Sequence, residues 1–188
     1  MTSLHPVPAD ALKTEAWANG AGTTTVMASG PDTRWTWRLS IADIAQACDF
    51  SAYPDTQRQF VALDAPVQLR FENGRELSLL RLQITRFDGA DAPHVALPEG
   101  PTRAFNLMLR GDAQGELIAR PLNGSMWLPA RASWRWFVHV VGGRAEVKTA
   151  HECVEVSGGA NLWIDAQPGE RVRIEGGGEL ILVQLAAS

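Results

Sequence analysis

The segment Arg34-Trp35-Thr36-Trp37-Arg38-Leu39-Ser40-Ile41-Ala42 carries the clearest structural signal in this chain of 188 residues. Large apolar side chains occupy every second position, and mostly polar side chains occupy the positions between them. A period of two over this length is typical of a β-strand. Arg38 and Ser40 therefore share one face of the predicted strand, and the tryptophans share the other.

Shorter segments of similar character follow along the chain, and turn residues separate them. Asn123-Gly124, Gly142-Gly143 and Gly176-Gly177-Gly178 are among the predicted turns. Only residues 42–47 suggest a helical turn, and residues 86–101 form the longest predicted loop. Many short strands between such turns predict an all-β sandwich or barrel. The other predicted strands cover residues 23–28, 58–63, 67–71, 77–85, 104–110, 116–121, 134–141, 145–148, 161–165, 171–175 and 179–185.

The composition is that of an ordinary globular protein, with 45% apolar and 20% charged residues. The length favours one domain. A net charge of −4 argues against a general affinity for nucleic acid or for an anionic membrane. Residues 1–12 resemble a short tail without the apolar core of a signal peptide, and no apolar run is long enough to span a membrane. Because the two cysteines form no CxxC motif, we expect reduced thiols and a cytoplasmic protein.

The sequence contains no recognisable cofactor or nucleophile motif. No two histidines are two residues apart, and neither HExxH nor CxxC occurs, so we expect no metal ion and no other cofactor. The glycines of residues 19–24 lead into a β-branched run rather than a helix, which argues against a phosphate loop. No GxSxG motif surrounds Ser40, and Asp49 opposes a thiolate at Cys48, so a serine or cysteine hydrolase is disfavoured. The histidines are His5, His94, His139 and His151.

Two predicted strands combine a strongly apolar face with a selectively polar one. Arg38 and Ser40 share the polar face of the first, and Asn106 and Met108 share that of the strand at residues 104–110. These faces are either solvated, as in many half-buried antiparallel strands, or they line a pocket. In a pocket, a guanidinium group can bind a carboxylate through two hydrogen bonds.

Other residues extend this pocket hypothesis. Arg58 is a second candidate cation, with a surface ion pair as its alternative. Trp17 precedes the glycine-rich turn, in which Gly20 permits a positive φ and successive N–H groups can accept an anion. We expect Trp17 to form a pocket wall and the other tryptophans to pack in the core.

Five motifs in one order resemble the HutD/Ves family of small proteins. The resemblance is clear from residue 17 to residue 110 and more diffuse beyond, where residues 158–183 resemble the closing strands of a cupin jelly roll. Ala21, Asp55, Ala90 and Ala104 stand where the family pattern has glycine or aspartate. The motifs are Trp17-x-Asn19-Gly20-x-Gly22-x-Thr24, Trp37-Arg38-Leu39-Ser40-Ile41-Ala42, Phe50-Ser51-Ala52-Tyr53-Pro54 with Arg58, Phe87-Asp88-Gly89, and Gly100-Pro101 with Phe105-Asn106-Leu107-Met108-Leu109-Arg110.

The resemblance implies an all-β double cupin, in which two jelly-roll β-barrel halves, residues 1–111 and 112–188, pack as one unit. It implies metal-independent binding of a small acidic metabolite, linked to histidine or amino-acid degradation, such as formiminoglutamate, or to a stress response. It leaves a homodimer open, and neither nucleic acid nor membrane is an expected partner. The expected ligand-binding residues are Asn19, Gly20, Arg38, Ser40, Arg58 and Asn106, with Trp17, Tyr53 and Met108 as pocket walls.

Two other functions stay open from the sequence. A metal-free cupin enzyme, such as an isomerase, lyase or hydrolase, needs a general acid or base in the pocket, for which Tyr53, Asp55 and Asp88 are candidates. A regulatory or structural protein without a ligand predicts a pocket filled by side chains and Arg38 on the open surface. The direction of Arg38 therefore separates a binding site from a solvated strand.

Overall fold

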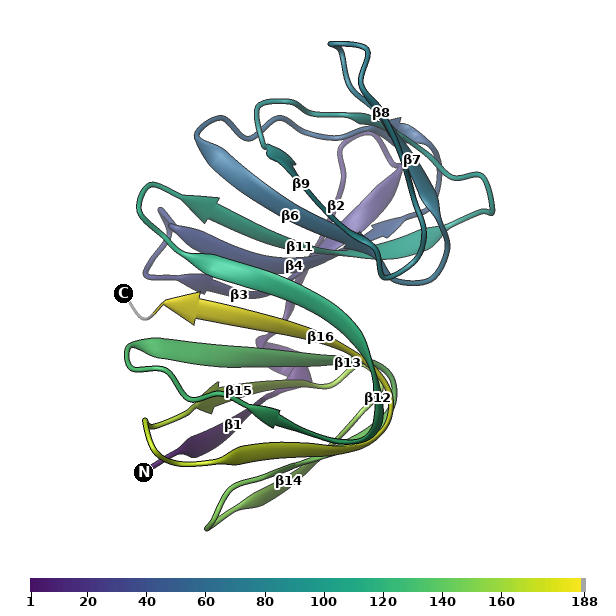
Figure 1. The fold of residues 1–188 in the computed structure, drawn as a ribbon. Helices are drawn as coiled ribbons and strands as arrows, with labels where there is room; N and C mark the ends of the chain where they lie inside the picture. The colour runs from purple at the N-terminus through teal and green to yellow at the C-terminus, as the bar shows by residue number, and fades with distance from the viewer. Residues whose placement is uncertain (187–188) are drawn as a thin grey trace. The chain divides into compact units, whose positions relative to one another are not determined.

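Strands make up most of residues 1–186, which the computed structural model describes (Figure 1). These residues contain one 3-10 helix, Ala9–Ala11, and no α-helix. The helical turn predicted at residues 42–47 is wrong, because β4 continues through Ile44 and the next N–H, that of Ala45, donates to the carbonyl of Ala21. The strands are β1 (Ser3–Val7), β2 (Lys13–Ala16), β3 (Gly22–Gly30), β4 (Trp37–Ile44), β5 (Cys48–Asp49), β6 (Thr56–Ala62), β7 (Val67–Arg70), β8 (Glu76–Leu79), β9 (Ile84–Asp88), β10 (His94–Ala96), β11 (Thr102–Arg110), β12 (Gly115–Leu128), β13 (Trp134–Lys148), β14 (Cys153–Ser157), β15 (Asn161–Asp165) and β16 (Val172–Ala186).

The chain forms two compact units. Unit 2 is the continuous segment Leu12–Ala113, and unit 1 combines Met1–Ala11 with the chain from Gln114 onward. The expected tail at the start of the chain is instead β1, which pairs antiparallel with β15 and buries Leu4 in the core of unit 1. The structure therefore differs from the predicted division of the chain in its first eleven residues.

Unit 1 is a single sheet in the order β1-β15-β13-β16-β12, with β14 paired to β13. The long strands β12, β13 and β16 curve together in Figure 1. The turns predicted at Asn123-Gly124, Gly142-Gly143 and Gly176-Gly177-Gly178 are wrong, because these residues lie inside the three strands. A Cβ on Gly143 would lie 2.1 Å from the carbonyl oxygen of Gly177, so the curve requires glycine where two strand backbones meet.

Unit 2 is built from two sheets, β2-β3-β4-β11-β6-β9 and β5-β10-β7-β8. One apolar core includes Phe60 of the first sheet with Leu69 and Val95 of the second. Phe71, just after β7, packs edge-on against Phe87 of β9, with ring centroids 5.5 Å apart. Burial of each such side chain contributes about 2 kcal/mol. The described chain is nearly all-β, as predicted, although its sheets are not closed as barrels in either unit.

Local chemistry explains two further differences in unit 2. The strand predicted at residues 77–85 is broken into β8 and β9 by a turn, in which the Gln83 side chain accepts the Leu80 N–H. Leu82 has a positive φ of 61° in this turn, a conformation that its side chain type does not signal. The loop predicted at residues 86–101 contains β10, which pairs with both β5 and β7.

Strand register places the polar side chains of unit 2 in rows. Ser40 of β4 lies opposite Asn106 of β11, and Met108 of β11 lies opposite both Arg38 of β4 and Arg58 of β6. Residues directly opposite each other point to the same face of a sheet. Ser40, Asn106 and Arg58 are only 4–6% exposed, so this face is not a solvated strand surface.

Candidate functional site

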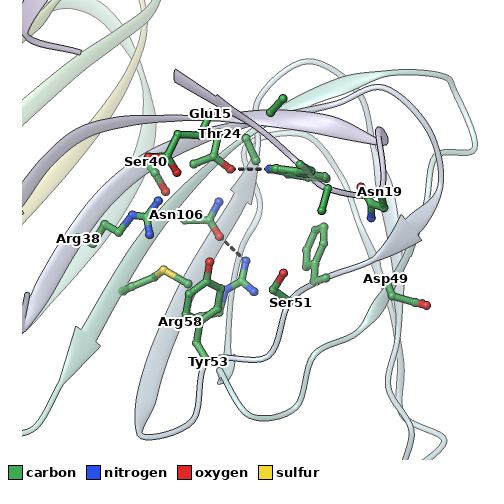
Figure 2. A pocket seen from close by; sticks show the side chains of 16 residues that line it. Glu15, Asn19, Thr24, Arg38, Ser40, Asp49, Ser51, Tyr53, Arg58 and Asn106 are labelled. Carbon is green, nitrogen blue, oxygen red and sulfur yellow. Dashed lines mark hydrogen bonds between the residues drawn. The ribbon is translucent and has the colours of Figure 1, made fainter. Parts of the chain in front are cut away.

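A cavity of about 430 Å³ lies on this polar face, entirely within unit 2 (Figure 2). Strands β2, β3, β4, β5, β6 and β11 contribute to it, together with the turn after β2 and the segment that follows β5. The cavity is open space, which contradicts the expectation of a pocket filled by side chains. The lining residues are Glu15, Ala16, Trp17, Ala18, Asn19, Thr24, Arg38, Ser40, Ala42, Asp49, Phe50, Ser51, Tyr53, Arg58, Asn106 and Met108.

Arg58 is the most deeply buried cation of the cavity, with 6% of its surface exposed. Its Nη2 donates to Oδ1 of Asn106 at 2.8 Å, while its Nε is buried without a hydrogen-bond partner. Aromatic rings of Phe50 and Phe87 lie 5.1 Å from the guanidinium carbon, and that of Tyr53 lies 5.9 Å away. The rings and the amide stabilise the charge only in part, because no carboxylate pairs with Arg58 in the described chain.

The protonation of Arg58 reflects this environment. Burial lowers its pKa to about 10, since a charged guanidinium loses solvation there. The phenol of Tyr53 opposes that shift, and the positive charge of Arg38 adds to it. At neutral pH Arg58 stays protonated, so the cavity contains an incompletely compensated positive charge.

Arg38 supplies the second positive charge. It lies on β4 and points into the cavity, as Figure 2 shows. Its Nε is buried without a hydrogen-bond partner, and the described residues provide no ion pair for it. The inward direction of Arg38 favours the binding-site interpretation of the sequence over the solvated strand.

Trp17, which the sequence analysis expects at a pocket wall, lies in the lining of the cavity. Its Nε1 donates to Oγ1 of Thr24 at 2.7 Å, which fixes the orientation of the indole. Its ring also packs edge-on against Phe50, with centroids 6.4 Å apart. Gly22 is needed beneath this ring, because a Cβ there would lie 3.2 Å from the indole and 2.0 Å from the Asp43 carbonyl oxygen.

The turn after Trp17 does not form the predicted concavity of N–H groups. The Gly20 N–H donates to the carbonyl of Trp17, and the Ala21 N–H donates to Oδ1 of Asn19. Gly20 has the positive φ that the sequence suggested, 68°, but it does not line the cavity. Asn19 does line it, so this turn presents a side chain rather than its backbone.

Half of the sixteen residues that line the cavity were named as site residues in the sequence analysis. Asn19, Arg38, Ser40, Arg58 and Asn106 all line the cavity, and so do the predicted walls Trp17, Tyr53 and Met108. The acidic residues Glu15 and Asp49 were missed. Both are exposed in the structure, and neither belongs to an alternating pattern that would mark it in the sequence. Asp49 accepts a hydrogen bond from Nδ1 of His94 at 2.8 Å, whereas Glu15 has no partner in the described chain.

Of the three candidates for acid–base chemistry, only one lines the cavity. Tyr53 lines the cavity, and in Figure 2 its hydroxyl points toward the space beside Arg58. Asp55 and Asp88 do not line it, and the carboxylate of Asp88 accepts the N–H of Ala90 instead. Residues 1–186 contain no group of three or more His, Cys, Asp or Glu side chains that could hold a metal ion. His139, one of the four histidines, lies in unit 1, where its Nδ1 is hydrogen-bonded to Oδ1 of Asn161.

The sequence profile of the HutD family matches residues 9–182. The chain belongs to the HutD family. The structure is similar to that of HutD from Pseudomonas fluorescens SBW25 (formate condition), with a TM-score of 0.78 and 25% sequence identity. The match covers 98% of this chain and 100% of that one. The protein of unknown function PA5104 from Pseudomonas aeruginosa PAO1 has a TM-score of 0.87 at 23% identity, with the same coverage.

More distant structures show that this HutD-family chain has the predicted cupin fold. A cupin 2 conserved barrel domain protein from Leptotrichia buccalis has a TM-score of 0.55 at 8% identity, covering 88% of each chain. No curated protein matches the chain. No helix within residues 1–186 is long and apolar enough to cross a membrane.

Two departures from the HutD pattern have clear structural settings. Ala104 is completely buried and lies between Ala42 and Ala62 of the neighbouring strands, at the apolar base of the polar row. Ala21 is also buried and packs in the same core. Aspartate in place of Ala104 would put a carboxylate into this apolar core two residues before Asn106.

Proposed function

We propose that this HutD-family protein binds a small acidic metabolite in the cavity of unit 2, without a metal ion. A single observation carries the proposal: Arg58 is 6% exposed, its charge has no carboxylate partner in the described chain, and it lines an open cavity. An unpaired buried charge is costly. A ligand carboxylate would offset that cost and would hydrogen-bond to the guanidinium.

The other lining groups suit a small polar molecule. Arg38 provides a second guanidinium, and the amides of Asn19 and Asn106 can each donate and accept hydrogen bonds. Trp17 and Phe50 provide apolar surface for a carbon chain or a planar group. An intermediate of histidine degradation such as formiminoglutamate has this combination of groups, and the HutD family membership supports that class.

Calorimetry with formiminoglutamate, glutamate and urocanate tests the proposal. The wild type should bind at least one of them with a Kd below the millimolar range. Arg38→Ala should weaken that binding about tenfold or more, as expected for loss of a charge-assisted hydrogen bond. Arg34→Ala is the matched control, because Arg34 is exposed and does not line the cavity. Absence of binding to the wild type at millimolar ligand would refute the proposal.

A metal-free enzyme is the second candidate function, and it is supported by the position of the Tyr53 hydroxyl in the cavity. Proton NMR of each ligand during incubation with the protein distinguishes the two functions. A binding protein leaves the spectra of the ligands unchanged. Conversion by the wild type that is lost in Tyr53→Phe would instead identify an enzyme with Tyr53 as its acid or base.

A further inference from the structure

Glu15 is a carboxylate on the same face as the two guanidinium groups. It lies on β2 opposite Thr24, and Thr24 lies opposite Ala42 of β4, so the three side chains point to one face. All three line the cavity. Figure 2 draws Glu15 on the same side of the cavity as Ser40 and Arg38.

The carboxylate of Glu15 has no ion-pair or hydrogen-bond partner among residues 1–186. No ion pair joins it to Arg38 or to Arg58, although all three side chains line one cavity. The other acidic residue of the rim differs, because Asp49 is hydrogen-bonded to His94 and its side chain is 86% exposed. The cavity therefore presents to a bound molecule the positive charges of Arg38 and Arg58, the unpaired carboxylate of Glu15 and the hydrogen-bonded carboxylate of Asp49.

We propose that the ligand carries a protonated nitrogen, as ammonium or amidinium, beside its carboxylate, and that Glu15 binds this group. The inference rests on the proposed function and specifies its ligand class. A purely anionic ligand is attracted by Arg38 and Arg58 and repelled by Glu15. An amphoteric ligand is attracted by all three, so Glu15 selects between otherwise similar acids.

Matched ligand pairs test this selection. Formiminoglutamate and N-formylglutamate differ mainly in an amidinium against a neutral amide, and glutamate differs from glutarate by one ammonium group. The wild type should bind the nitrogen-protonated member of each pair about fivefold more tightly, the upper range for a solvent-exposed ion pair. Glu15→Gln should remove the preference by weakening binding of formiminoglutamate and glutamate and strengthening binding of glutarate.

One control variant locates the effect. Glu72→Gln removes an exposed carboxylate of the same unit that does not line the cavity, and it should leave the preference intact. Because β2 is an exposed edge strand, Glu15→Gln should not change the thermal midpoint, which checks that the variant is folded.

The outcomes separate this inference from the proposed function. Equal binding of both members of each pair by the wild type, with Arg38→Ala still weakening both, would overturn the inference and leave the acidic-metabolite site standing. A preference that persists in Glu15→Gln or disappears in Glu72→Gln would also overturn it. Loss of all binding in the wild type would refute the proposed function itself.

Discussion

Arg58 and Asn106 form a side-chain pair across neighbouring strands, with Nη2 of the arginine 2.8 Å from Oδ1 of the asparagine. The pair holds the guanidinium in place through a neutral acceptor, which leaves its positive charge available. A carboxylate at the same position would hold it equally well and would neutralise it. The amide at residue 106 thus leaves the positive charge of Arg58 without a carboxylate partner in the described chain.

Asn106→Asp should therefore weaken ligand binding and increase the stability of the fold at pH 7. The new carboxylate pairs with Arg58, so affinity for the anionic ligand should fall at least about tenfold. Arg58 lowers the pKa of this carboxyl below its unfolded value near 4, so the added stability is present at pH 7 and is lost as the pH falls through the folded pKa. Thermal unfolding at pH 7 and pH 3, with calorimetry, measures both effects. Asn123→Asp, at an exposed position of β12, is the control. Wild-type affinity in Asn106→Asp would contradict the prediction.

Thr24→Val should loosen the aromatic wall. It removes the acceptor for Nε1 of Trp17, so we expect about 1 kcal/mol of lost stability and a several-fold loss of ligand affinity. Thr25→Val is a matched control, because the Thr25 hydroxyl bonds Thr14 outside the cavity lining. Urea unfolding and calorimetry on both variants give the comparison. Equal losses of affinity in the two would show that the orientation of Trp17 does not matter.

Asp64→Asn should reveal an acid-sensitive ion pair of unit 2. The Nε and Nη2 atoms of the Arg103 guanidinium donate hydrogen bonds to the Asp64 carboxylate, at 2.9 and 2.8 Å. These bonds lower the pKa of that carboxyl. The stabilisation is present above the unfolded pKa of about 4 and is lost as the pH falls through the folded value. The pair is partly exposed, so the variant should lose about 1 kcal/mol at pH 7 and less at pH 3 in urea titrations. A loss independent of pH would contradict this assignment, and Asp112→Asn serves as the exposed control.

Gly143→Ala should disrupt the curved strands of unit 1. A Cβ there would lie 2.1 Å from the Gly177 carbonyl oxygen, so we expect a loss of about 3 kcal/mol or more. Gly124→Ala is matched in backbone strain, with φ of +90° against +88°, but its Cβ meets no atom within 4 Å. It should lose about 1–2 kcal/mol. Equal losses in urea unfolding would show that strain rather than collision governs this position.

The sequence predicts a residue's place well where burial imposes a period. Arg38, Ser40 and Asn106 were found because each alternates with large apolar side chains, and their strands are central in the sheet. Glu15 gave no such signal, because every residue of β2 is exposed and an edge strand has no alternating burial. Gly143 was misread as a turn because glycine serves equally in a turn and where two strand backbones approach closely.

Strand pairing between segments far apart in the chain also could not be predicted from the sequence. Ser3 lies opposite Asp165 in the sheet of unit 1, and no local pattern identifies a partner so far along the chain. The motifs that resemble the HutD family lie between Trp17 and Arg110, and all the residues that line the cavity belong to unit 2.

The interrupted course of unit 1 has a consequence for synthesis on the ribosome. β1 emerges before unit 2 but has no partner until β15 has been made, whereas every strand of unit 2 is complete once Ala113 has emerged. Domains generally fold as units during translation. The cavity can thus form before β1 is paired, and a nascent chain arrested after unit 2 has emerged already contains every residue that lines it.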